Sequence, residues 1–241
     1  IGMNSMKAIS VGSTNTTIGK DSMLVATTGN DNVSVGYQTL LALSSGSGNT
    51  AIGVGSLRAA TTVSDTLAVG KNSLAAMTTG TANTGVGVGS LAAVVTGASN
   101  TALGNAAGAI MTGSGNTLLG ASAGSLLTTG TKNTFIGSYN GNQNSLNLID
   151  ASNNIVISDG DGVPRIYVNT AGDYLLNSVT SNNFKLQLIG NGSLISARSS
   201  TNANELRINS ESGIVAINAF ADAGNAALAL RCDTALAWFV G

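Results

Sequence analysis

The sequence predicts a mainly β, elongated repeat protein, a solenoid-like fibre built from 17-residue units. Nine glycines recur with seven intervals of 17 residues and one of 16, and an aliphatic residue precedes each of them. The composition agrees, because only 4% of residues are aromatic and 9% are charged, too few for an ordinary globular core. A strict period of this length indicates one small structural unit stacked on itself. The anchor glycines are Gly2, Gly19, Gly36, Gly53, Gly70, Gly87, Gly104, Gly120 and Gly137.

The residues before each anchor glycine predict a short strand. Positions are counted from the glycine, which is position 0. Asn recurs at −4 and Thr at −3, followed by a variable residue at −2 and the aliphatic residue at −1, as in Asn100 to Gly104. Thr and the aliphatic residue alternate along the block and lie on one face of a pleated strand.

The residues after the glycine predict a short helical turn, with a second strand over positions +4 to +8 as the alternative. Ser stands at +3 in most units, and apolar residues stand at +4 and +7, as in Ser56, Leu57 and Ala60. This spacing is helical, and Ser is a good N-cap. The closing Thr-Thr-Gly, as in Thr78 to Gly80, suits a left-handed cap.

The Asn and Thr columns predict ladders of stacked polar side chains that hydrogen-bond from one coil to the next. One strand per coil gives a rise of roughly 4.8 Å and a stack about 40 Å long. In the later units the Ser-Leu pair becomes Ala-Gly, at Ala107-Gly108 and Ala123-Gly124, near the one-residue deletion between Gly104 and Gly120. We expect closer backbone approach there, as a narrower fibre or a tighter contact with a neighbouring chain.

The aliphatic columns predict self-association. A single coil has three of them, at −1, +4 and +7, and one chain leaves at least one column exposed. Exposed apolar stripes and strand edges favour association. We therefore predict a parallel homotrimer around a shared axis.

The period breaks down after Asn142, which predicts a repeat array over 1–142 and short-stranded β modules over 143–241. Asn153 to Val168 is expected to form a hairpin with an Asp-Gly-rich turn. The Trp238-Phe239 pair is expected to pack in an apolar cluster. Further strands are expected at 184–189, 193–197, 205–209, 214–218, 226–231 and 235–240.

Composition excludes several functions. The net charge is −1 with no basic patch, so no nucleic-acid partner is expected. No apolar stretch approaches 18 residues, so no membrane insertion is expected. Cys232 is the only cysteine and forms no disulfide within the chain; it is a buried thiol or pairs across chains. The chain starts at Ile1 without a signal peptide, which indicates an internal piece of a longer protein.

No catalytic, cofactor-binding or metal-binding residues are predicted, and no enzyme activity is expected. The chain has no histidine, so it lacks a Ser-His-Asp triad and an imidazole metal site. Asp150, Asp159 and Asp161 could bind Ca²⁺, but a Gly/Asp turn explains the last two better. The other candidates considered and set aside are the Gly53–Gly55 and Gly87–Gly89 pairs as phosphate loops, Glu205, Glu211 and Asp222 as glycosidase carboxylates, and sequons at Asn15 and Asn191.

Two stretches resemble bacteriophage tail fibres. One is the block from Asn100 to Gly108, repeated from Asn116 to Gly124, and the other runs from Asn154 through Gly162 to Asn169. The strand block is also similar to the head repeat of trimeric autotransporter adhesins, which has a shorter period. The resemblance covers about residues 1–170 and implies a trimeric, elongated virion fibre that reaches for a host-surface receptor.

Three functions are therefore considered. The first is a structural segment of a phage tail fibre in the virion, with other tail or baseplate proteins and a host glycan or protein as partners. The second is a bacterial trimeric adhesin at the cell surface. The third is a monomeric ice-binding β-solenoid, suggested by the Thr column and disfavoured by the variable residue at −2, which is Thr17, Ala51 or Leu118 in different units.

Overall fold

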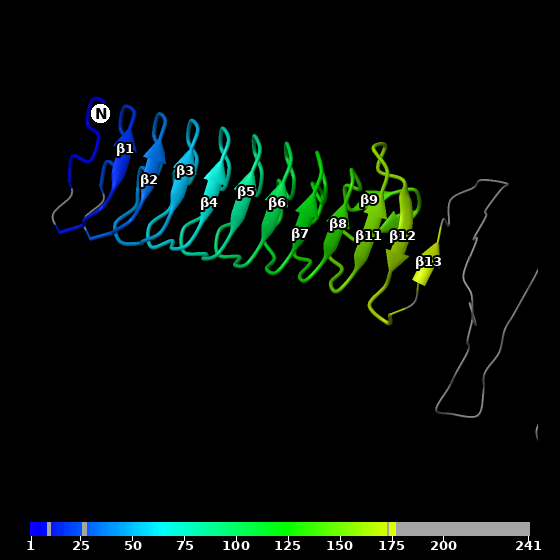
Figure 1. The fold of residues 1–241 in the computed structure, drawn as a ribbon. Helices are drawn as coiled ribbons and strands as arrows, with labels where there is room; N and C mark the ends of the chain where they lie inside the picture. The colour runs from blue at the N-terminus through cyan, green and yellow to red at the C-terminus, as the bar shows by residue number, and fades with distance from the viewer. Residues whose placement is uncertain (9–10, 26–27, 173, 177–241) are drawn as a thin grey trace, which may run out of the picture. The chain divides into compact units, whose positions relative to one another are not determined.

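The computed structural model describes residues 1–8, 11–25, 28–172 and 174–176 (Figure 1). The chain divides into two units, Ile1–Phe184 and Lys185–Gly241, and the second lies wholly outside the described residues. The strands expected from residue 184 onward, Cys232 and the Trp238-Phe239 pair therefore also lie outside them.

The first unit is a parallel β-solenoid in which each coil contributes one three-residue strand. Each strand pairs in parallel with the next, in a register that sets Thr16 beside Val33 and Thr50 beside Leu67. The described residues contain no helix. These observations confirm the mainly β solenoid and its spacing of about 17 residues. The strands are β1 (Thr16–Ile18), β2 (Val33–Val35), β3 (Thr50–Ile52), β4 (Leu67–Val69), β5 (Thr84–Val86), β6 (Thr101–Leu103), β7 (Thr117–Leu119) and β8 (Thr134–Ile136).

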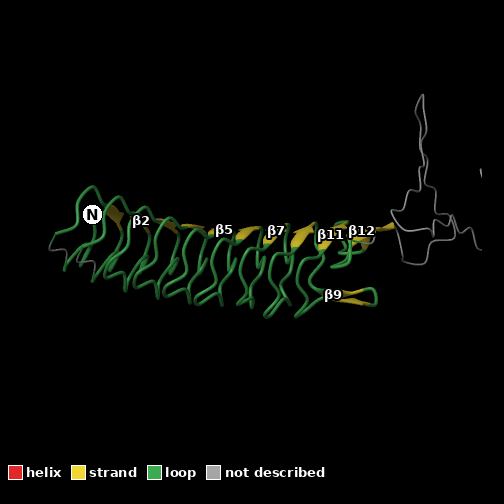
Figure 2. Ribbon diagram, turned by 90° about the horizontal axis from the view of Figure 1, so that it is seen from below, coloured by secondary structure: helices red, strands yellow, loops and turns green. Residues whose placement is uncertain are grey.

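The stack continues past residue 142, although the sequence period does not. After β8 the chain forms a small antiparallel hairpin of β9 (Asn142–Gln143) and β10 (Leu146–Asn147), which stands apart from the row of strands in Figure 2. Then β11 (Ile155–Ser158) pairs in parallel with β8, so it adds another coil.

The hairpin predicted over Asn153 to Val168 is confirmed. β12 (Pro164–Val168) pairs antiparallel with β11, and β13 (Tyr174–Leu176) pairs antiparallel with β12. The turn between β11 and β12 carries Asp159 and Gly162, as expected from its Asp-Gly composition. The sheet thus changes from parallel to antiparallel at this end.

Close backbone stacking explains the anchor glycines. Gly87 has a φ of +136°, and a Cβ added to it would lie 2.2 Å from the carbonyl oxygen of Gly104 in the next coil. The Thr-Thr-Gly glycines form a second such column, because a Cβ at Gly113 would lie 2.0 Å from the oxygen of Gly130. The predicted left-handed cap at these second glycines is wrong for Gly29, Gly80, Gly97 and Gly130, where close approach alone requires glycine.

The asparagines at −4 form the predicted ladder. The Nδ2 of Asn100 donates to the carbonyl of Gly113 (2.9 Å), and its Oδ1 accepts from the backbone N–H of Asn116 (2.9 Å). Asn133 and Asn154 continue this pattern into the coil of β11 (3.0 Å). The predicted Thr ladder is wrong within the described residues, because the Thr side chains at −3 point outward and make no such bonds.

The predicted helical turn after the glycine is wrong in the described coils, and the alternative second strand is also absent. Residues at +2 and +4 both adopt positive φ, as in Asn72 (56°) and Leu74 (52°), which a helix forbids. The backbone instead bonds to the neighbouring coil, with the Leu74 N–H donating to Ser90 (3.0 Å) and the Ala76 N–H to Ala92 (3.1 Å). Two alternating left-handed residues therefore place the +4 and +7 side chains on the same inner side.

The core is a column of side chains from positions −2, +3, +4 and +7, and those described between Thr17 and Leu127 are buried. Met6 at +4 of the first coil is only partly buried. In the Ala-Gly coils the space is filled from the opposite side of the coil. A Cβ at Gly108 would lie 2.8 Å from Leu118 Cδ1, and one at Gly124 would lie 2.9 Å from Leu118 Cδ2. The glycines at +4 thus accommodate a large residue at −2, rather than narrowing the fibre as expected.

Candidate interaction surface

The surface with the most regular chemistry is the outer side of the strands, here called the strand face. The alternation of a three-residue strand turns −2 inward and both −3 and −1 outward. The Thr column and the −1 aliphatic column therefore run side by side along the outside of the row of strands. The −1 column is Ile18, Val35, Ile52, Val69, Val86, Leu103, Leu119, Ile136 and, in the last coil, Ile157.

The strand face is apolar and exposed. Leu103 is 52% exposed, Ile18 44% and Ile136 39%, high values for aliphatic side chains that recur in register. Residues 1–142 contain eight charged side chains, and none of them stands at −3 or −1. The strand face is thus an uncharged stripe of branched side chains and Thr methyl groups.

The backbone holds this face rigid at both edges. Before each strand, residues at −5 bond to the preceding coil, as in the Asp65 N–H to Ser47 (3.0 Å). After each strand, residues at +2 do the same, as in the Asn72 N–H to Val54 (2.9 Å). The side chains at −3 and −1 are therefore presented at the fixed spacing of the coils.

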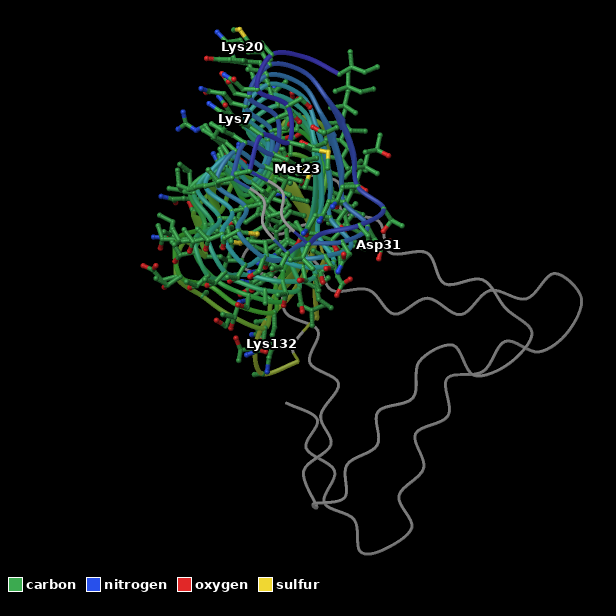
Figure 3. All side chains as sticks on the ribbon, turned by 90° about the vertical axis from the view of Figure 1, so that its left-hand side faces the viewer. Lys7, Lys20, Met23, Asp31 and Lys132 are labelled. Carbon is green, nitrogen blue, oxygen red and sulfur yellow. The ribbon has the colours of Figure 1, made fainter. Side chains whose placement is uncertain are left out.

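The opposite side of the solenoid, formed by positions +5 and +6, is different. It carries small residues such as Ala76 and Ala93, and larger exposed ones such as Ile110 (47%). Lys7 and Arg58 interrupt it. Figure 3, viewed along the stack, shows Lys7 and Asp31 on different sides of the coil and Met23 labelled near its interior.

Of the three acidic residues considered for Ca²⁺, Asp150 and Asp159 bond through their carboxylates to donors of the chain itself. Asp150 accepts from the Thr129 hydroxyl (3.0 Å) and from that of Thr128, and these bonds lower its pKa. Asp159 accepts from the Val163 N–H (2.9 Å) and pairs with Arg165; these contacts hold its pKa below the ordinary value. The Asp161 carbonyl accepts from Gln143 (3.4 Å) of the β9–β10 hairpin.

The remaining titratable groups with shifted pKa values are tyrosines in the last coils. Burial raises the pKa of Tyr139, whose hydroxyl donates to the carbonyl of Leu146 (2.8 Å). Burial also raises the pKa of Tyr167, whose hydroxyl donates to Asn154 Oδ1 (3.0 Å). Both phenols therefore tie the hairpins to the stack.

The described residues contain no group of three or more His, Cys, Asp or Glu side chains placed to hold a metal ion. Within the same residues no helix is long and apolar enough to cross a membrane. Glu205, Glu211, Asp222 and Asn191 lie outside the described part, and Asn15 Nδ2 donates to Gly29 in the Asn ladder (2.8 Å).

Fold and surface together define a single-chain parallel β-solenoid with an exposed, uncharged strand face. Comparison with family models, curated proteins and solved structures found no match for this chain.

Proposed function

We propose that this chain is a structural segment of a homotrimeric phage tail fibre, in which three copies place their strand faces around a shared axis. The observation that carries the proposal is the aliphatic column at −1, which is in register over all the parallel coils. Ile18, Ile52, Leu103, Ile136 and Ile157 of this column are exposed, and the members between them are partly exposed. Burying such a column stabilises an assembly by roughly 25 cal/mol per Å² of apolar surface. The fibre would belong to the virion and help to present host-receptor binding, with tail or baseplate proteins as its further partners.

The distribution of charge selects the strand face over the opposite side as the axial surface. An axis built from positions +5 and +6 would bury Lys7 and Arg58 beside their own copies. Like charges brought together away from water are strongly unfavourable. The −3 and −1 columns of the strand face, which would lie nearest the axis, carry no charge and avoid this cost.

The size of the surface is adequate for a stable assembly. From −5 to +1 the face is at most about 20 Å wide, at ~3.3 Å per residue. Eight intervals of ~4.8 Å make it about 38 Å long. The product is at most about 800 Å² per copy, which is the usual contribution of one partner to a specific interface.

An ice-binding solenoid is the second candidate, and one observation favours it. The variable residue at −2, which argues against ice binding when taken as part of the face, points into the core instead. What remains outside is a flat array of Thr and aliphatic residues. Its Thr hydroxyls have no hydrogen-bond partner among the described residues. A bacterial trimeric adhesin is the alternative that shares the trimer but sits on a cell surface.

The test is the mass of the full chain in solution by light scattering, for the wild type and two matched variants. Leu103→Lys places a charge on the strand face, and Ile110→Lys places one on the opposite side of the same coil. We expect a particle of three times 23.7 kDa for the wild type and for Ile110→Lys, and a monomer for Leu103→Lys. Residues 103 and 110 are 52% and 47% exposed, so neither change disturbs the core of one chain.

Two other outcomes count against the trimer. A wild-type monomer would overturn it, and thermal hysteresis of ice growth that Leu103→Lys abolishes would establish the ice-binding candidate instead. A trimer that Ile110→Lys breaks and Leu103→Lys leaves intact would place the axis on the opposite side.

A further inference from the structure

The two edges of the strand face differ in charge. The leading edge consists of the residues at −5, before each strand: Thr14, Asp31, Gly48, Asp65, Ala82, Ser99, Gly115 and Lys132. The trailing edge consists of the residues at +1, after each strand: Met3, Lys20, Tyr37, Val54, Lys71, Val88, Asn105, Ala121 and Ser138. In the first five coils the leading edge is therefore acidic and the trailing edge basic.

The charged residues of these edges are exposed and have no ion-pair partner in the described part of the chain. The one salt bridge within that part joins Arg165 to Asp159. Lys20 lies over the ring of Tyr37, with its Nζ 5.9 Å from the ring centroid. Asp31 accepts a hydrogen bond from the Thr14 hydroxyl. In Figure 3, Lys20 and Asp31 lie well apart on the coil, as expected for opposite ends of the strand face.

Three other groups of charges lie near these edges. Lys132 stands on the leading edge four coils beyond Asp65, outside the coils that carry the acidic residues. Asp21 follows Lys20 at +2, accepts a hydrogen bond from Asn4 Nδ2 (2.9 Å) and, unlike Asp31 and Asp65, is partly buried. Asp159, which follows β11, is paired with Arg165. Lys7 and Arg58 belong to the opposite side. The unpaired opposite charges of the two edges are thus Asp31 and Asp65 against Lys20 and Lys71.

A three-fold axis brings unlike edges together. Rotational symmetry produces head-to-tail contacts, in which the leading edge of one copy meets the trailing edge of the next. It also allows no shift along the axis, so facing residues must stand at the same height. Asp65 and Lys71 satisfy this condition because they flank the same strand, β4. Asp31 and Lys20 flank neighbouring strands, one coil or roughly 4.8 Å apart, which a lysine side chain can span.

We propose that Asp65 and Asp31 of each copy pair with Lys71 and Lys20 of the next, so that these edge charges fix the parallel, unshifted register of the trimer. The proposal rests on the proposed function, because it needs strand faces at a shared axis. The apolar face alone specifies register weakly, since every coil presents similar side chains. Charged pairs at the rim supply that specificity, since a shift by one coil separates Asp65 from Lys71.

Charge reversal tests the pairing. Asp65→Lys alone and Lys71→Glu alone place like charges opposite each other at three interfaces, and we expect each to weaken the trimer at least about 10-fold. The double variant restores attraction and should return the dissociation constant to within about 3-fold of the wild type. Arg58→Glu is the control with an equal change in charge on the opposite side, and we expect no effect from it. The measurement is trimer dissociation by analytical ultracentrifugation at low salt.

Cross-linking tests the register. In a Cys232→Ser background, Asp65→Cys combined with Lys71→Cys should give a covalent trimer upon oxidation. Within one chain the strand β4 lies between the two positions and holds them at opposite edges of the strand face, up to about 20 Å apart and too far for a disulfide. The control combines Asp65→Cys with Lys20→Cys, which differ by three coils or about 14 Å, and should give no covalent trimer.

The outcomes separate this inference from the proposed function. One set of results would overturn only the edge pairing. In it, Leu103→Lys still breaks the trimer, neither edge reversal weakens it, and cysteines at 65 and 71 do not cross-link it. Cross-linking by the 65/20 pair instead of the 65/71 pair would replace the register. A wild-type monomer overturns both proposals.

Discussion

The early and late coils have the same backbone but very different cores. In the early coils the inner positions −2 and +3 carry hydroxyls: Ser22 lies 2.7 Å from Ser34 and 3.1 Å from Thr39, Oγ to hydroxyl oxygen, all buried. In the late coils the inner positions hold Leu118 and Phe135. Yet strand register, the glycine column and the Asn ladder continue across both regions. The coil is therefore set by its backbone contacts, and the core needs only a filled volume with its polar groups paired.

The largest expected effect comes from the glycine column, and it should be the same in both regions. Gly19→Ala and Gly104→Ala each place a Cβ within 2.3 Å of a carbonyl oxygen of the next coil, at positive φ. Strain and overpacking together should cost about 4 kcal/mol in the free energy of unfolding. Chemical denaturation monitored by circular dichroism measures the loss.

Gly89→Ala is the matched control for this prediction. Gly89 has a φ of +66°, but an added Cβ there meets nothing within 4 Å. It should cost about 1 kcal/mol, the conformational penalty alone. If Gly19→Ala cost no more than Gly89→Ala, backbone contacts between coils would not be what sets the shape of the coil.

Truncation inside the core should distinguish the two regions. Phe135 is fully buried and meets Tyr139 edge to face, with ring centroids 5.1 Å apart. Phe135→Ala should therefore cost about 3 kcal/mol. Ser34→Ala in the early coils should cost only about 1 kcal/mol, because Ser22 and Thr39 still bond to each other. Equal losses in thermal or chemical unfolding would contradict the difference between the two cores.

The smallest effect concerns the boundary between the two kinds of core. Ser56 Oγ is buried without a hydrogen-bond partner in the described residues, because the neighbouring −2 positions are Ala51 and Ala68 rather than hydroxyl residues. Ser56→Ala should raise the free energy of unfolding by about 1 kcal/mol. Ser73→Ala, which removes bonds to Gly85 (2.8 Å) and Ser90 (3.0 Å), should instead lower it by a similar amount. A destabilising Ser56→Ala would show that its hydroxyl has a partner after all.

The features that recur in the sequence were the predictable ones. The anchor glycines and the Asn column report backbone contacts between coils, and such contacts must repeat at every coil. The helical turn was mispredicted because a +4/+7 spacing fits both a helix and a turn with left-handed residues at +2 and +4. Leu74 and Leu91 both adopt a positive φ. The sequence could not indicate this, because leucine rarely adopts that conformation.

The candidate surface was only partly predictable. At least one of the three aliphatic columns was expected to stay exposed in a single chain, and the column at −1 does, whereas those at +4 and +7 are buried from Met23 onward in the described coils. The variable residue at −2 was counted against a regular ice-binding face, whereas it lies in the core, where Leu118 at −2 is matched by Gly108 at +4. The coil of β11 was missed because the β9–β10 insertion lengthens its spacing and breaks the period.

The decisive measurement is the solution mass of the full chain, compared between the wild type and Leu103→Lys. A mass of three times 23.7 kDa that falls to one copy in the variant is the expected result, because the charge would lie at the shared axis. A wild-type mass of 23.7 kDa, or a trimer indifferent to the charge on the strand face, would contradict the account.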